Sequence, residues 1–336
     1  MNRLLKDGAA LASACAVTIA TTSAAWAEPE KTDIKVTAFT GSLVTLIERV
    51  AVWEGFLEKE GLNASFVEVT NGPAMIASVL GGSADFTATA PIFAWNLYEK
   101  GECLSMFGAE IGSFYSFIAG EGVDLPNLDK GFPDSVRDLK GKRIGVVGRG
   151  TATEQWASTV LSDAGLDPEK DVTFVATGGM TTALPALENG MVDALFSFPP
   201  NENNLEPGTF TVVARLFDSE VPSLAKMIQA GPVSTCDFKQ EYPQTQAAYC
   251  RAWHAAYDFT LDPANTKAME GVVSKIMGVD DAAANDIWET YKGALIGPLW
   301  TEETWAAQAK YLPLVDGKPM SPPPFADMID QSCSGR

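Results

Sequence analysis

The sequence of 336 residues contains a single histidine, His254, and only 24 lysines and arginines against 43 aspartates and glutamates. One histidine cannot supply a histidine-rich metal site. The formal charge of −19 argues against nucleic-acid partners, because a protein that binds polyphosphate needs a basic surface to displace counterions. Nucleic-acid binding and metal chemistry based on histidine clusters are therefore excluded.

The sequence also lacks the common motifs of nucleotide-binding and serine-hydrolase sites. It has no G-x-x-x-x-G-K-[ST] loop and no G-x-S-x-G elbow. The run Gly148–Thr153 half-matches a dinucleotide fingerprint, but a threonine stands where close helix–strand packing needs the third glycine. A hydrolytic triad would have to use His254, which falls in a predicted helix. We expect no catalytic residue, no metal and no cofactor.

No apolar run approaches the roughly 20 residues that a membrane-spanning helix needs. Residues 1–27 instead have the features of a cleaved secretory signal peptide: a basic start, a short apolar stretch and the sequence Ala25-Trp26-Ala27. Lipid attachment at Cys15 is the alternative, although it leaves only about seven apolar residues ahead of the cysteine. We expect cleavage after Ala27 and a periplasmic product.

Four cysteines follow the predicted leader, and an even number suits disulfide formation in an oxidising compartment. Cys236 and Cys250 have the shortest spacing. A bridge between them would close a loop of about 15 residues, for a stabilisation of about 3 kcal/mol in the chain-entropy treatment. We predict this disulfide, with buried free thiols as the alternative.

Two stretches, 33–91 and 141–199, follow the same order of predicted elements. Each begins with an apolar strand, a small polar turn and a helix that ends at a glycine, Gly61 or Gly165, where a left-handed residue is favoured. Each then adds a strand, a short helix and a strand that ends before a proline. This alternation predicts an α/β protein of two lobes, each a parallel-rich sheet flanked by helices.

The remaining sequence indicates how the lobes connect. Residues 103–122 form two β-rich runs broken at Gly112, which suits a strand that crosses from one lobe to the other. From about residue 237 the pattern is helical, with Asp280 and Thr301 as predicted N-caps. A helical tail must pack somewhere, and the first lobe is its natural host. We therefore predict lobe 1 over residues 28–114 and 221–336 and lobe 2 over residues 115–220.

The predicted arrangement places a ligand cleft between the lobes. In open parallel sheets, ligands bind beyond the carboxyl ends of the strands, where the following helices present unpaired N–H groups. The turns at these ends are rich in hydrogen-bond donors, although helix capping is the commoner role of any single Ser or Thr. As a set they favour a polar or anionic ligand. The predicted ligand-binding residues of these turns are Thr40, Gly41, Ser42, Asn71, Gly72, Thr89, Arg149, Thr151, Thr177 and Gly179.

Arg149 is the only basic residue in these turns, and a guanidinium can bind an oxyanion through two N–H groups at once. The alternative is a solvated loop arginine. Phe114, Tyr115 and Phe198 are predicted to form an apolar wall of the ligand site, although aromatic residues at strand ends more often belong to the core.

Four segments carry a family resemblance as an ordered set: FLEKEGLNASFVEV (56–69), LGGSADFTATAP (80–91), DLKGKRIGV (138–146) and ALENGMVDALFSFPP (186–200). Over roughly residues 33–260 the chain resembles the periplasmic solute-binding proteins of ABC importers. Its nearest branch is the group for nitrate, sulfonate, taurine and thiamine-pyrimidine precursors. The resemblance implies a Venus-flytrap fold that captures a small solute and delivers it to a membrane permease with a cytoplasmic ATPase. It maps the family's ligand loops onto 40–42, 71–72, 89–91, 148–151 and 178–181.

The same resemblance bears on enzymatic activity. Members of this fold that make a thiamine pyrimidine carry a cysteine-rich iron-binding stretch and histidines, whereas this chain has no clustered cysteines and one histidine. We therefore expect a monomeric binding protein. The alternatives are the binding component of a TRAP-type carrier, a sensor module, and, less favoured, an exported enzyme on the same fold.

Overall fold

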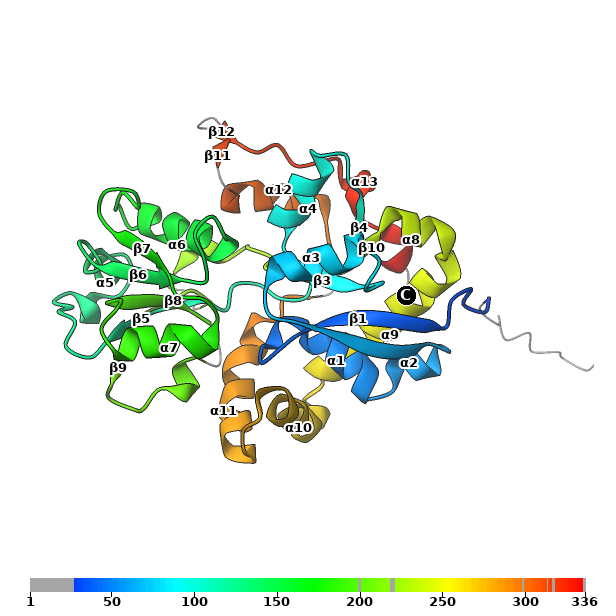
Figure 1. Ribbon diagram of the computed structural model, residues 1–336, viewed down its shortest axis with the longest axis horizontal. Helices are drawn as coiled ribbons and strands as arrows, with labels where there is room; N and C mark the ends of the chain where they lie inside the picture. The colour runs from blue at the N-terminus through cyan, green and yellow to red at the C-terminus, as the bar shows by residue number, and fades with distance from the viewer. Residues whose placement is uncertain are drawn as a thin grey trace, which may run out of the picture.

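The computed structural model describes residues 27–198, 201–217, 221–297, 299–312, 314–315 and 318–334. Residues 1–26, which hold nearly all of the predicted leader, lie outside this range. The strands and helices form two groups that lie side by side in Figure 1, where one group is green and the other runs mainly from blue to cyan and from yellow to red. No described helix combines the length and the apolar character needed to cross a bilayer.

The first group contains two small sheets. Strand β1 (Asp33–Phe39) pairs in parallel with β2 (Asn63–Val69). In the other sheet β10 (Gly231–Thr235) lies between β3 (Thr87–Thr89) and β4 (Leu104–Met106) and is antiparallel to both. A parallel bridge between Val36 and Phe86 joins the two sheets. Parallel pairing therefore covers only part of this group.

The second group is a five-stranded sheet with the order β7-β6-β8-β5-β9. Strand β6 is parallel to β7 and β8, whereas β5 is antiparallel to β8 and β9. The sheet thus has a parallel half, as expected, and an antiparallel half. Its strands are β5 (Ser116–Gly120), β6 (Arg143–Val146), β7 (Thr173–Ala176), β8 (Ala194–Ser197) and β9 (Phe210–Arg215).

The internal repeat is confirmed element by element. The order β1, α1, α2 (Phe56–Lys59), β2, α3, β3 in the first group matches β6, α6, β7, α7, β8 in the second, with α1 and the short α2 together in the place of α6. Gly61 and Gly165 both take positive φ, at 77° and 88°, which explains why glycine recurs there. The helices concerned are α1 (Leu46–Trp53), α3 (Gly72–Leu80), α6 (Ala152–Asp163) and α7 (Met180–Glu188).

The helical tail also forms as predicted. Helix α9 (Pro243–Leu261) packs on α1 and on α2 (Phe56–Lys59), so the tail covers the first group. Asp280 accepts a hydrogen bond from Ala283 N at 2.9 Å, and Thr301 accepts one from Thr304 N at 3.1 Å, so both N-caps are confirmed. The remaining helices are α4 (Pro91–Tyr98), α5 (Asp134–Arg137), α8 (Cys236–Glu241), α10 (Thr266–Met277), α11 (Asp281–Tyr291), α12 (Glu302–Ala307) and α13 (Phe325–Met328).

Two segments of the chain connect the groups. Among the described residues, neither segment is one continuous strand shared by both sheets. The run 103–122 forms β4 in one sheet and β5 in the other, with residues 107–115 between them. The return connection, which ends in residues 221–230, leads from β9 to β10. The two connections pair with each other, because Gln229 N donates to Ile111 O at 2.8 Å and Ile111 forms a bridge with Ala230. The boundaries proposed for the lobes, 114/115 and 220/221, fall within these connections.

The predicted disulfide between Cys236 and Cys250 is wrong. Cys236 pairs with Cys103, and Cys250 pairs with Cys333. The reason lies in the position of Cys236 at the start of α8. There, directly after β10, it lies beside the start of β4, and Cys236 N donates to Cys103 O. Cys250 is near in sequence but lies within α9, whereas Cys236 begins α8 at the end of β10, so the strand pairing decides its partner.

Candidate ligand-binding pocket

A cavity of about 740 Å³ lies between the two groups and is lined by residues of both. The first group contributes residues from the turns after β1, β2 and β3, and the second group contributes residues from the turns after β6, β7 and β8. The two connections supply Phe114, Tyr115, Gln229 and Ala230. The pocket therefore lies where the carboxyl ends of the strands in both halves of the repeat meet, as the sequence predicted.

Helix N-termini surround this pocket. The N-cap residues of four α-helices line it: Asn71 of α3, Ala90 of α4, Thr151 of α6 and Gly179 of α7. Ser42, which caps the short 3-10 helix Leu43–Thr45, lines it as well. The first N–H groups of a helix have no partner within the helix, so these termini direct hydrogen-bond donors and positive dipole ends at one space.

The N-caps of these helices differ, and Ala90 of α4 makes no side-chain cap bond. Asn71 accepts a hydrogen bond from Ala74 N at 2.8 Å, so its side chain already satisfies one donor of α3. Neither Thr151 nor Gly179 makes a side-chain cap bond. The Thr151 hydroxyl instead donates to Gly148 O at 2.7 Å. The N-termini of α6 and α7 thus present donors that no N-cap side chain satisfies.

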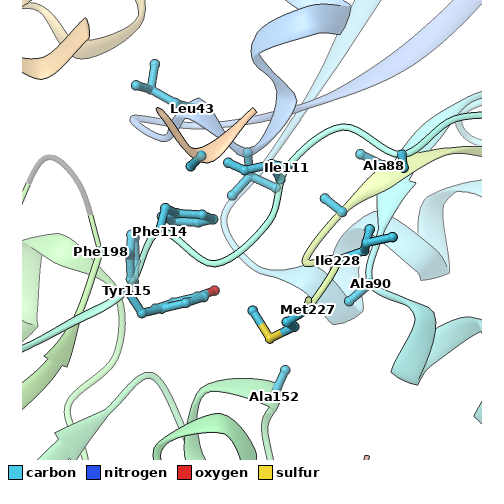
Figure 2. Close-up of a cluster of buried hydrophobic side chains, with 14 of the residues drawn as sticks. Leu43, Ala88, Ala90, Ile111, Phe114, Tyr115, Ala152, Phe198, Met227 and Ile228 are labelled. Atoms are coloured by element: carbon cyan, nitrogen blue, oxygen red, sulfur yellow. The ribbon is translucent and has the colours of Figure 1, made fainter. Parts of the chain in front are cut away.

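Aromatic rings form much of the remaining wall. Phe114 stacks on Tyr115 at 4.6 Å between ring centroids and meets Phe198 edge-on at 6.3 Å. Figure 2 shows these three rings together, with the Tyr115 hydroxyl pointing toward the connection that holds Met227 and Ile228. Trp156 lies 5.1 Å from Tyr115 and also lines the pocket. Burial raises the pKa of Tyr115, and a side-chain hydrogen bond from Gln229 partly opposes this, so the phenol stays protonated at neutral pH.

Most of the predicted ligand-binding residues line the pocket. These are Ser42, Asn71, Gly72, Thr89, Phe114, Tyr115, Thr151, Gly179 and Phe198. The structure places Thr40, Gly41, Arg149 and Thr177 outside the lining. Thr40 donates to Glu68 on β2 at 3.0 Å, and the Thr177 hydroxyl donates to Val146 O on β6 at 3.1 Å, so each hydroxyl bonds to the neighbouring strand.

Arg149 is the most informative of the residues outside the lining. Its guanidinium forms an ion pair with Glu154 at 2.8 Å, donates to Phe174 O at 3.1 Å and lies over the Phe174 ring. These partners hold the side chain on the outer surface of the second group, and 61% of it is exposed to solvent. Arg149 lies in the turn after β6, as the sequence indicated. Its position in that turn does not fix the direction of its side chain.

None of the described residues that line the pocket is charged. Sequence reasoning missed several of its uncharged members, namely Val44, Met75, Phe93, Trp156 and Gln229. Phe93 in α4 and Trp156 in α6 lie within the first two turns of helices that follow predicted ligand loops. Both residues would have been included if the predicted loops had been extended into these helices. Gln229 gave no signal, because it lies in a connection without a regular pattern.

The single histidine lies elsewhere. His254 is buried on α9 and is not among the residues that line the pocket. Within the described part of the chain, no group of three or more histidine, cysteine, aspartate and glutamate side chains has the spacing of a metal site.

Comparison with known proteins shows to which family the chain belongs. A family model described as NMT1/THI5 like matches residues 46–266, which is well over half of the chain and spans elements of both groups. The chain belongs to the NMT1/THI5-like family. Among curated proteins, this NMT1/THI5-like chain is 31% identical over 150 residues to a Brucella abortus protein that is named a candidate binding protein. It is 25% identical over 228 residues to 4-amino-5-hydroxymethyl-2-methylpyrimidine phosphate synthase of Schizosaccharomyces pombe.

These matches are partial. The first covers 45% of this chain and 43% of the Brucella protein, so the NMT1/THI5-like chain spans less than half the length of that relative in the match. The second covers 65% of this chain and 62% of the yeast enzyme. The curated proteins that this chain matches thus include both a candidate binding protein and an enzyme.

Solved structures confirm the fold. The periplasmic aliphatic sulphonate binding protein SsuA from Escherichia coli is similar with a TM-score of 0.67, covering 84% of this chain and 85% of that one at 17% identity. The periplasmic nitrate-binding protein NrtA from Synechocystis PCC 6803 is similar with a TM-score of 0.64, covering 83% of this chain and 76% of that one at 13% identity. The NMT1/THI5-like chain therefore has the periplasmic-binding-protein fold expected from its sequence.

Proposed function

We propose that this protein is the extracytoplasmic solute-binding component of an ABC importer, and that it binds a small uncharged solute with a flat apolar part. The observation that carries this proposal is a pocket between two α/β halves that is ringed by helix N-termini and aromatic side chains and has no charged residue among its described lining. A site of this kind binds by hydrogen bonding and ring contact. Its described lining holds no His, Asp, Glu, Lys or Cys side chain, and its one tyrosine, Tyr115, keeps its proton at neutral pH, so no general base is in place there.

Several features support binding without chemical change. All four cysteines beyond the predicted leader are held in disulfides, so none is free to ligate iron or act as a nucleophile. Two of the similar solved structures are named as periplasmic binding proteins, one for aliphatic sulphonate and one for nitrate. The predicted leader and the disulfides both fit a periplasmic, monomeric protein that delivers its ligand to a permease and an associated ATPase.

A second candidate ligand is a small anion such as an alkanesulfonate or nitrate. The free N-termini of α6 and α7 favour it, because backbone N–H groups and the positive end of the helix dipole can hold an oxyanion without a basic side chain. The negative net charge of the chain opposes it by lowering the local concentration of anions. We therefore place the uncharged solute first.

The proposal is tested with the leaderless protein and a panel of alkanesulfonates, nitrate, taurine, carboxylates and pyrimidines. Binding is followed by tryptophan fluorescence and calorimetry, and each hit is recovered and analysed for chemical change. We expect an uncharged pyrimidine or another flat solute to bind and to be recovered intact. Recovery of a converted product would favour the enzyme, and failure of the whole panel would contradict the proposal.

A matched pair of variants locates the binding site. Phe93→Ala removes a ring that lines the pocket, and we expect it to weaken binding by about fivefold to thirtyfold because the lost ring contact is worth on the order of 1–2 kcal/mol. Phe259→Ala removes a half-buried ring on α9, outside the lining, and should leave the affinity within about twofold. Equal effects of the two substitutions would place the ligand elsewhere.

A further inference from the structure

Gln229 occupies a special position in the pocket wall. It lies in the return connection just before β10 and lines the pocket together with Ala230. Its backbone N donates to Ile111 O at 2.8 Å, and the neighbouring Ile228 N donates to the Gln308 side chain at 2.8 Å. The backbone on both sides of the residue is therefore held in place, which fixes where its side chain begins.

The side chain of Gln229 is more than nine-tenths buried, with 8% of the residue exposed. Its amide hydrogen-bonds to the hydroxyl of Tyr115, the residue that faces it from the other connection. The carbonyl oxygen Oε1, in contrast, has no hydrogen-bond partner among the described residues. A buried amide oxygen without a partner is unfavourable, and native proteins rarely leave one unless something else satisfies it.

The pocket around Gln229 supplies donors but few side-chain acceptors. Helices α3, α6 and α7 begin at the pocket and direct their N–H groups into it. The lining threonine hydroxyls of Thr151 and Thr153 already bond to each other at 2.9 Å. The oxygen of Gln229 is therefore the acceptor that the wall of the two connections offers. This oxygen has almost no exposed surface, so a ligand reaches it only when the terminal torsion, which is broad in glutamine, turns it toward the pocket.

We propose that Gln229, positioned by Tyr115, determines specificity by accepting a hydrogen bond from an N–H donor on the ligand. This inference rests on the proposed function and refines it: the solute is a flat, uncharged ring or amide that carries an N–H group on the edge facing the two connections. The ligand satisfies the buried Oε1, while its acceptor edge faces the helix N-termini. A solute of the same shape without the N–H group leaves Oε1 unpaired and binds more weakly.

The test compares two probes that differ in one donor: 4-amino-5-hydroxymethyl-2-methylpyrimidine and the same ring without the 4-amino group. Calorimetry gives the dissociation constant of each. We expect the unmodified pocket to prefer the amino compound by about tenfold or more, since a site that pairs with a polar group rejects the analogue lacking it. Gln229→Leu, of similar size but without polar atoms, should reduce this preference to within about threefold.

Two further variants guard against misfolding and indirect effects. Gln229→Glu keeps an acceptor at the same place and should retain the preference for the amino compound, whereas loss of the preference would overturn the proposal. Gln155→Leu makes the same substitution on α6, outside the lining, and should change neither affinity. Circular dichroism and the thermal midpoint confirm that each variant is folded.

The outcomes separate this inference from the proposed function. If the protein binds other solutes of the panel but neither pyrimidine probe, or if Gln229→Leu keeps the full preference, the role of Gln229 is refuted and solute binding stands. If no solute of the panel binds at all, the proposed function and the role of Gln229 fall together.

Discussion

Two carboxyl groups, one on α1 and one in the 107–115 connection, are buried and form no ion pair with any described residue. Glu48 on α1 and Glu110 in the 107–115 connection are both completely inaccessible to solvent. Glu110 accepts a hydrogen bond from Ile47 N, and Glu48 accepts one from the Trp253 indole, both at 3.2 Å. The second oxygen of each carboxyl has no hydrogen-bond partner, and neither forms an ion pair within the described residues. We expect this pair to make folding depend on pH.

Burial raises the pKa of Glu48 to about 7, and burial together with the charge of Glu48 raises the pKa of Glu110 well above its ordinary value. In the unfolded chain both carboxyls titrate near 4.5. The folded state therefore holds protons that the unfolded state releases. The contribution of these two carboxyls to the free energy of unfolding is fully present below about pH 4.5. It is lost as the pH rises through their folded pKa values. For Glu48 alone, the loss between pH 4.5 and pH 7 is about 3 kcal/mol.

The assay is urea unfolding of the leaderless, disulfide-intact protein, followed by tryptophan fluorescence between pH 5 and pH 8. The free energy of unfolding should fall across this range by a few kcal/mol. Tyr249, Tyr257 and Tyr291 face the pair, but their pKa values are raised as well, so they do not titrate in this window. Glu110→Gln should flatten the fall, because it removes one ionisation and the repulsion it exerts on Glu48.

The control is Glu121→Gln, which neutralises an exposed carboxylate in a turn and should leave the slope of stability against pH unchanged. A free energy of unfolding that stays level or rises from pH 5 to pH 8 would show that the buried pair does not hold protons in the folded state. A Glu110→Gln variant with the unaltered slope would refute the assignment of the titration to this pair.

Two further predictions concern crosslinking and the predicted anion contact. Replacing Cys103 and Cys236 by serine should lower the free energy of unfolding by about 2–5 kcal/mol, measured by urea titration, and the leaderless parent protein, which lacks Cys15, should show no free thiol when it is unfolded without reduction. Measurable free thiol would contradict the pairing. Arg149→Ala should leave the affinity for any solute within about threefold, because the side chain is paired with Glu154 outside the pocket lining. A larger loss for an anionic solute, measured by calorimetry, would restore the role that the sequence predicted for Arg149.

Local rules determined the features that the sequence predicted correctly. Gly61 and Gly165 mark helix ends because only glycine takes positive φ at little steric cost. Asp280 and Thr301 mark helix starts because their side chains bond to the first free N–H groups. The order of these signals repeats in both halves, and the repeat was sufficient to place the pocket at the turns that follow the strands.

Features that depend on neighbours distant in sequence could not be predicted in this way. The side chain of Arg149 follows Glu154 and Phe174, which come close only when α6 and β7 are in place. The partner of Cys236 is set by the pairing of β10 with β4, across 133 residues. Gln229 reaches the pocket because its connection pairs with the segment around Ile111. Each of these depends on tertiary packing rather than on a local pattern.

The pairing of the cysteines has a consequence for biosynthesis. A chain made from its N-terminus exposes Cys103, Cys236 and Cys250 well before Cys333, which follows Cys250 by 83 residues. During that interval Cys250 is a free thiol close in sequence to Cys236, and a bridge between those two is the easiest to close. The native pattern is reached without reshuffling only if Cys103 captures Cys236 first. Early docking of β10 against β4 is therefore the step that protects the nascent protein from a wrong crosslink.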